Sequence, residues 1–216
     1  MKDGTLPSQR YHTFVLLMLS GGFMGAYSYF LKGGVFANAE TANLLILAFN
    51  IAELNTEGII SVLYPISAFF IGTFFSQMFI EKLGRRWIPT LLIVEIMALI
   101  SLSLLPSETP DRVFHVVIAV LSSMQFNTFR KARGVAMSTL FCTAHLRGFG
   151  ASLYSAIADR KGEELKKSLY HGGLIMTFLA GGISCSLISK SLGGYTIALS
   201  SLPLLFVLQE VLRKER

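Results

Sequence analysis

Long apolar stretches follow one another along almost the whole chain, and short polar segments separate them. Most contain about 18 residues or more, the length that an α-helix needs to cross a hydrocarbon core of about 30 Å. The pattern therefore predicts an all-α membrane protein. Its eight candidate helical segments are 12–31, 35–52, 58–80, 88–106, 113–129, 136–157, 171–189 and 193–212.

The charged residues between these segments indicate which of them cross the membrane, because Lys and Arg are more frequent in cytoplasmic loops. If all eight crossed, the basic loop "EKLGRR" (81–86) would lie outside and the acidic "ELNTE" (53–57) inside. If 35–52 and 136–157 enter the membrane and return to the same side, six helices cross and the basic segments share the side of the N-terminus. We therefore predict six crossings with both termini in the cytoplasm, with seven or eight crossings as alternatives.

Composition supports a single membrane domain over residues 1–216. Hydrophobic residues make up 52% of the chain and charged residues 15%, whereas soluble domains are roughly 25% charged. The net charge of +6 sits at segment ends, as in cytoplasmic loops, so we expect membrane lipids as partners and no nucleic acid. Cys142 and Cys185 lie in apolar surroundings without a second ligand at metal-binding spacing, so we expect no metal and no cofactor.

Two polar motifs repeat along the chain. Thr41-Ala42-Asn43 and Thr143-Ala144-His145 are 102 residues apart, and each follows a helix and a glycine-containing entry. The helix after each motif carries small residues four apart, a spacing that lets helices approach closely in lipid. These residues are Ala68, Gly72 and Ser76 in one half and Thr177, Gly181 and Cys185 in the other. Three crossings in each half would insert the halves in opposite directions, so we predict an inverted repeat of residues 12–106 and 113–212.

The motif segments also resemble a known family. "GGFMGAYSYFLKGGVFANAETANLL" and "MQFNTFRKARGVAMSTLFCTAHLRGFG" are similar to the YoaK-like bacterial membrane proteins, catalogued as a domain of unknown function (DUF1275). The family pattern has Thr-Gly-Asn at both motifs, and this sequence has Ala42, Ala144 and His145 at three of those positions. The resemblance implies a multi-pass protein of the bacterial inner membrane and supplies no substrate.

The motifs supply candidate binding residues. If each polar segment reaches the middle of the membrane, Thr41 and Thr143 are placed to cap a returning half-helix. Two helix N-termini meeting there favour an anion or a carbonyl oxygen, and Asn43, His145 and Arg147 add hydrogen-bond donors. The alternative is that these side chains only satisfy the interrupted backbone and bind nothing.

Three further polar side chains lie in apolar segments, where ionisable groups are expensive. We expect Glu40 to pair with Arg147 or His145 of the opposite motif, as a structural clasp or as part of a binding site. Glu95 interrupts "LLIVEIMALI" and is, with Glu40 and His145, a candidate for proton coupling, unless it reaches the membrane surface. Gln125 either lines a cavity or bonds to a neighbouring helix.

No enzyme signature is present, since the chain lacks a phosphate-binding loop, a His-Glu-x-x-His helix and a nucleophile near a base. We therefore expect a transporter or channel rather than an enzyme. Its expected solute is a small anion that contacts Glu40, Thr41, Asn43, Gln125, Thr143, His145 and Arg147, with a cation or neutral solute as the alternative. The second hypothesis is a non-transporting membrane scaffold, and a homo-oligomer fits either hypothesis.

Overall fold

The computed structural model describes residues 7–132, 135–160 and 162–215. Lys2, Arg133, Lys161 and Arg216, which contribute to the predicted loop charges, lie outside the described residues. Each of the eight apolar segments overlaps a helix, which confirms the all-α class. The helices are α1 (Tyr11–Leu31), α2 (Glu40–Ala52), α3 (Thr56–Leu83), α4 (Trp87–Ser103), α5 (Asp111–Thr128), α6 (Cys142–Asp159), α7 (Gly162–Leu192) and α8 (Ser201–Glu215).

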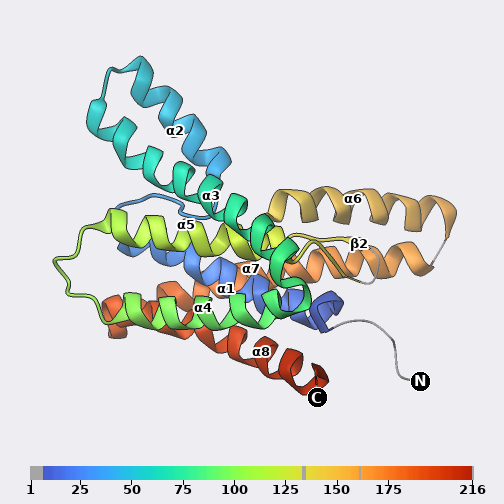
Figure 1. Ribbon diagram of the computed structural model, residues 1–216. Helices are drawn as coiled ribbons and strands as arrows, with labels where there is room; N and C mark the ends of the chain where they lie inside the picture. Colours follow the sequence, from blue (N-terminus) through green and yellow to red (C-terminus); the bar gives the residue numbers. More distant parts are fainter. Residues whose placement is uncertain (1–6, 133–134, 161, 216) are drawn as a thin grey trace.

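Shorter elements connect these helices. Three 3-10 helices are present, η1 (Pro7–Gln9), η2 (Gly84–Arg86) and η3 (Gly193–Ser200). The sequence pattern did not indicate a small antiparallel ribbon of β1 (Lys131–Ala132) and β2 (Val135–Ala136). The ribbon turns the chain back towards the bundle between α5 and α6 (Figure 1).

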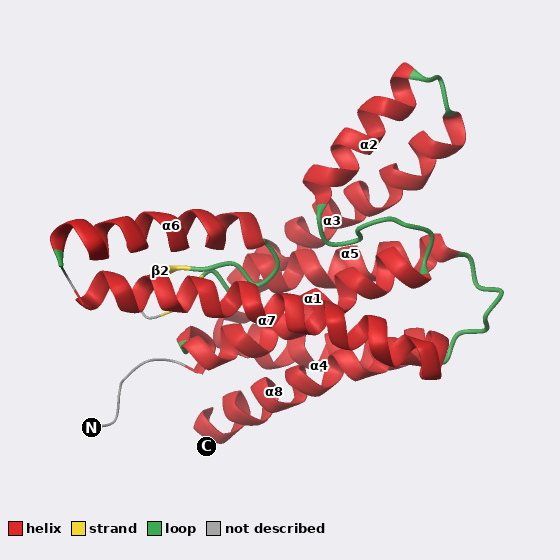
Figure 2. Cartoon of the chain, turned by 180° about the vertical axis from the view of Figure 1, so that it is seen from behind, coloured by secondary structure: helices red, strands yellow, loops and turns green. Residues whose placement is uncertain are grey.

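The helices α1, α4, α5 and α8 and the second halves of α3 and α7 form the main bundle, and two hairpins extend from it. Figure 1 shows α1, α4, α5, α7 and α8 side by side, with the start of α1 and the end of α8 at the same end. The hairpin of α2 and the first half of α3 projects towards one end, and that of α6 and the first half of α7 towards the other (Figure 2). Residues 32–39 run back along the bundle after α1, so α2 begins near the middle of the bundle and not at its edge.

The helix contacts have a reciprocal pattern. In the first half α2 packs on α3, and in the second half α6 packs on α7. Between the halves, α1 packs on α7, α5 packs on α3, and α4 packs on α8. Exchanging α1 with α5, α2 with α6, α3 with α7 and α4 with α8 leaves these main contacts unchanged.

The predicted small residues lie at the closest of these contacts. Gly72 of α3 is buried against α5, where an added Cβ would overlap the Ser123 hydroxyl and approach the Val120 carbonyl oxygen. Gly181 of α7 is buried against α1, where an added Cβ would overlap the Leu19 carbonyl oxygen. The small side chains therefore permit backbone-to-backbone contact, as the four-residue spacing predicts.

Among the described residues, three stretches of helix are long and apolar enough to cross a membrane: Tyr11–Leu31, Thr56–Ser103 and Gly162–Arg213. The second contains α3 and α4, and the third contains α7 and α8. Large apolar side chains point outwards from these helices, as on α3, where Phe70 and Phe74 are 71% and 63% exposed while Ser76 is buried. An apolar exterior around polar contacts between helices is typical of a protein in lipid.

Candidate functional site

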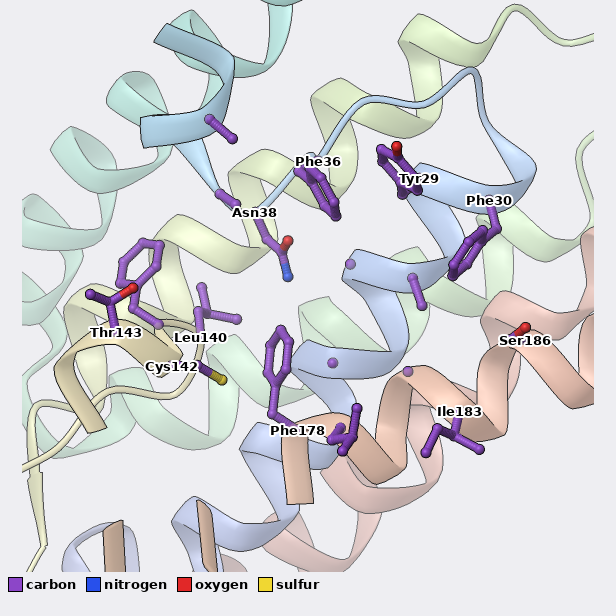
Figure 3. A pocket seen from close by; sticks show the side chains of 18 of the residues that line it. Tyr29, Phe30, Phe36, Asn38, Leu140, Cys142, Thr143, Phe178, Ile183 and Ser186 are labelled. Atoms are coloured by element: carbon purple, nitrogen blue, oxygen red, sulfur yellow. The ribbon is translucent and has the colours of Figure 1, made fainter. Parts of the chain in front are cut away.

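A groove of about 730 Å³ lies between the α1–α7 pair and the starts of α2 and α6. Residues of α1 and α7 form one side, including Gly22, Gly182 and Phe178. The other side comes from the segment around the start of α2 (Phe36, Asn38, Ala39 and Ala42) and from Leu140 to Thr143 at the start of α6 (Figure 3). The structure thus brings the two repeated segments, about one hundred residues apart in the chain, to one groove.

The lining of the groove is almost entirely apolar. None of the described residues that line it is Asp, Glu, Lys, Arg or His. Phe30 and Leu179 on its rim are 66% and 51% exposed, so the groove opens on the apolar outer surface of the molecule. Its volume is within the range of about 300–1,000 Å³ that small-molecule sites occupy.

Asn38 is the buried polar residue of the groove. Its side chain is 3% exposed, and its amide nitrogen donates to the Gly21 carbonyl oxygen at 2.9 Å. The described residues provide no hydrogen-bond donor for its Oδ1, and the amide points into the groove in Figure 3. The sequence analysis did not single out Asn38, although it stands in the polar entry segment two residues before Glu40.

The start of α2 is fixed by Asn43. Asn43 Nδ2 donates to the Phe36 carbonyl oxygen at 2.8 Å and to Glu40 Oε2 at 3.0 Å. Thr41 is exposed, and the N-cap residue is Ala39, which makes no side-chain cap. The prediction that Thr41 caps this helix is therefore wrong, because the amide of Asn43 already holds the entry segment against the first turn.

The start of α6 has the same arrangement with different side chains. His145 Nε2 lies 2.9 Å from the Ser138 carbonyl oxygen, and His145 Nδ1 lies 2.9 Å from His171 Nδ1 of α7. The Ser138 hydroxyl accepts from the Phe141 N–H at 2.8 Å. Thr143 is exposed and does not cap the helix, whose N-cap residue is Phe141, so the capping prediction is wrong here too.

The predicted clasp between the two motifs is also wrong. Glu40 Oε2 bonds to Asn43, and Glu40 Oε1 is buried without a partner among the described residues. Arg147 is exposed on α6, and His145 faces Ser138 and His171. Each motif therefore forms its hydrogen bonds within its own half of the molecule.

In a comparison with protein families, the family described as "Protein of unknown function (DUF1275)" matches residues 13–209 of the chain. The chain belongs to the DUF1275 family. The match covers the main bundle, both hairpins and both sides of the groove. No curated protein and no solved structure matches the chain.

Ala42 and Ala144, the alanines of the two repeated motifs, have different surroundings. Ala42 is half-buried and lines the groove, so its methyl group takes up space there. Ala144 is exposed on α6 and does not line it. Of the two alanines, only Ala42 contributes to the shape of the groove.

Glu95 and Gln125 of this DUF1275 protein lie away from the groove. Glu95 is 1% exposed and Gln125 is fully buried, so the alternative in which Glu95 reaches the membrane surface is wrong. Both oxygens of Glu95 and both polar atoms of the Gln125 amide lack hydrogen-bond partners among the described residues. The hypothesis that Gln125 bonds to a neighbouring helix is therefore wrong.

Proposed function

We propose that this DUF1275 protein is a membrane transporter or channel whose solute occupies the groove between α1, α7 and the starts of α2 and α6. The observation that carries the proposal is that both repeated segments line one groove of suitable volume. Irregular backbone at membrane depth is tolerated where it is buried in protein or lines a cavity. Residues 35–39 and 137–141, which are buried or partly buried, have that character if the bundle spans the membrane, and α2 and α6 are then re-entrant.

The reciprocal helix contacts favour an inverted repeat as the basis of this function. Many secondary transporters consist of two halves inserted in opposite directions, with the substrate bound where the repeats meet. The exchange of α1 to α4 with α5 to α8 preserves the helix pairs of this protein. We place the groove at the interface of two such halves.

We propose that both termini face the cytoplasm and that the membrane is the bacterial inner membrane. The start of α1 and the end of α8 lie at one end of the bundle (Figure 1). The charge rule assigns two basic segments to the same side as the N-terminus. They are the 3-10 turn with Arg85 and Arg86 and the start of α7 with Lys166 and Lys167.

The groove favours an uncharged, largely apolar or amphipathic solute over the small anion that the sequence suggested. An ionised solute needs a partner of opposite charge, and no charged residue lines the groove. Arg147 points away on the exposed face of α6. The Asn38 Oδ1 acceptor provides a specific partner for a hydroxyl or amide donor on such a solute.

The test combines binding with exchange. Purified protein is screened for thermal stabilisation by aliphatic alcohols, amides, carboxylates and amines, and each hit is assayed for exchange across sealed proteoliposomes. We expect stabilisation by neutral amphiphiles and faster exchange than in protein-free vesicles. Ala42→Phe fills the groove and should abolish both effects, whereas Ala48→Phe, at an exposed position on the same helix, should retain them.

The scaffold hypothesis makes the opposite prediction. No binding and no exchange by folded, correctly inserted protein would support it. Binding of carboxylates alone, unaffected by Ala42→Phe, would place an anion site elsewhere.

A further inference from the structure

Four buried polar side chains in the bundle have polar atoms without hydrogen-bond partners among the described residues. They are Glu95 of α4, Ser122 and Gln125 of α5, and Thr196 of η3. Glu95 is 1% exposed and the other three are fully buried. A buried polar atom without a partner costs about 1–3 kcal/mol, so four such side chains in one bundle require an explanation.

The hydrogen bond between α4 and α5 shows that Glu95 and Ser122 lie at nearly the same height. Trp87 Nε1 donates to Thr128 Oγ1 at 2.8 Å, where the two antiparallel helices begin and end. Glu95 follows Trp87 by eight residues, and Val120 precedes Thr128 by eight residues. At about 1.5 Å per residue, Ser122 is therefore about 3 Å from the height of Glu95, and Gln125 lies about two turns or less away.

Contacts of α1 place η3 in the same layer. Ser20 Oγ of α1 donates to the Ser200 carbonyl oxygen at 2.9 Å, and Tyr27 Oη donates to that of Gly194 at 3.2 Å. Thr196 lies between these two levels, within about 8 Å of Ser200 along a 3-10 helix.

The same layer extends through α1 to α5. The rings of Phe14 and Phe129 lie 6.5 Å apart, and those of Tyr27 and Phe114 lie 6.2 Å apart. Ser20 and Ser122 each lie about midway between the two pairs along their helices. Glu95, Ser122, Gln125 and Thr196 therefore lie at similar heights along the bundle and form a polar layer near its middle.

This layer contains one carboxylate and no described positive partner. Glu95 is the one ionisable residue of α4. The one ionisable residue of η3 is Tyr195, which is 64% exposed. The charged side chains of α5 lie in its first turn, and Glu210 of α8 pairs with Arg10 and His12 at the end of the bundle. An unpaired carboxylate in such a place is costly and points to a bound counter-charge.

We propose that Glu95, Ser122, Gln125 and Thr196 form a binding site for one small monovalent cation such as Na⁺. Hard cations bind several oxygen atoms, and the four side chains offer two carboxylate oxygens, one amide oxygen and two hydroxyls. The single negative charge balances a monovalent ion and leaves a divalent ion with excess charge. A proton on Glu95 would leave the hydroxyl and amide oxygens without partners.

The position of η3 supports the site. It is an eight-residue 3-10 run that interrupts the path from α7 to α8, and long 3-10 runs are uncommon. In many transporters, coupling ions bind where a helix is broken near the middle of the membrane. Coupling of the cation to transport rests on the proposed function, but binding of the cation does not, because none of these four residues lines the groove.

The test measures the thermal unfolding midpoint of the detergent-purified full chain in NaCl, LiCl, KCl and choline chloride at constant ionic strength and pH. We expect the midpoint to rise with Na⁺ or Li⁺ in a saturable way and to stay constant in choline. Glu95→Gln should remove the rise. Glu53→Gln, at the exposed position directly after α2, should keep the rise in the unfolding midpoint.

Ser122→Ala provides a second variant that does not depend on the carboxylate. It should need about tenfold more Na⁺ for the same rise, a change of about 1.4 kcal/mol. In choline it should be at least as stable as the natural protein, because it removes a hydroxyl without a partner. A midpoint that is equal in all four salts, or a Na⁺ effect that survives both Glu95→Gln and Ser122→Ala, would overturn the proposal.

Discussion

The starts of α2 and α6 solve the same structural problem with different side chains. Each helix has one buried residue, Asn43 in α2 and His145 in α6. Each of these side chains bonds to the carbonyl oxygen seven residues earlier, that of Phe36 or Ser138. The irregular entry segment is thereby tied to the first turn of its helix, which satisfies backbone groups that lipid cannot satisfy.

The two starts differ in what else they bind. Asn43 uses its amide a second time within its own turn, on Glu40, whereas His145 reaches across to His171 of α7. The arrangement of the backbone therefore persists while the side-chain chemistry changes. In the second hairpin, the contact of His145 with His171 links α6 to α7. In the first hairpin, the buried Asn43 bonds to the entry segment that precedes α2.

The largest expected effect concerns the opposite orientation of the halves. Glu57→Cys at the start of α3 and Glu163→Cys at the start of α7 are introduced separately into a protein with Cys142→Ala and Cys185→Ala. A membrane-impermeant thiol reagent should label the two positions from opposite faces of oriented vesicles. Labelling of both from one face would remove the inverted repeat and with it the comparison of the two halves.

The next effect compares the closest helix contacts of the two halves. Gly181→Ala should destabilise the protein by about 3 kcal/mol or more, because its methyl group meets the backbone of Leu19 and Phe23. Gly72→Ala should cost less, about 1–3 kcal/mol, because its nearest obstacle is the movable Ser123 hydroxyl. Unfolding in mixed detergent measures both, with Gly182→Ala as the control, since that position leaves ordinary van der Waals distances.

A double-mutant cycle tests the difference between the helix starts. His145→Asn and His171→Leu should show a coupling free energy of about 1 kcal/mol in unfolding, because the two rings contact each other directly. Glu40→Gln and Arg147→Gln should be additive within about 0.5 kcal/mol, because they share no contact. Coupling between Glu40→Gln and Arg147→Gln, together with additivity of His145→Asn and His171→Leu, would contradict the assignment of these hydrogen bonds within each half.

The smallest effect concerns the turns that join the hairpins. Leu54 before α3 and Arg160 before α7 both adopt left-handed backbone conformations, with φ of 54° and 53°. This conformation costs a side chain about 1–2 kcal/mol, and glycine adopts it freely but loses more entropy on folding. Leu54→Gly and Arg160→Gly should therefore each stabilise the protein by up to about 1 kcal/mol in thermal unfolding. A loss of stability in one half alone would show that the turns are not equivalent.

The sequence by itself determined the helices and their closest contacts. Runs of apolar residues are a local property, so each of the eight segments overlaps a helix, even though α2, α6 and α8 begin later than expected and α7 begins earlier. Gly72 and Gly181 were also identified from spacing alone, because small residues four positions apart define one face of a helix. The repeated motifs indicated where irregular backbone enters the bundle.

Only the tertiary structure decided which polar groups meet. Glu40 and Arg147 have opposite charges and similar positions in the two repeats, yet Glu40 bonds to Asn43 three residues away and Arg147 faces outwards. The groove is largely apolar because only Ala42 and Thr143 of the two polar motifs line it, and most of the other lining residues, from α1, α7 and the entry segments, are small, aromatic or aliphatic. The layer around Glu95 joins residues from α4, α5 and η3 that are far apart in the chain. Such neighbourhoods depend on the register between packed helices, and no local pattern of residues encodes that register.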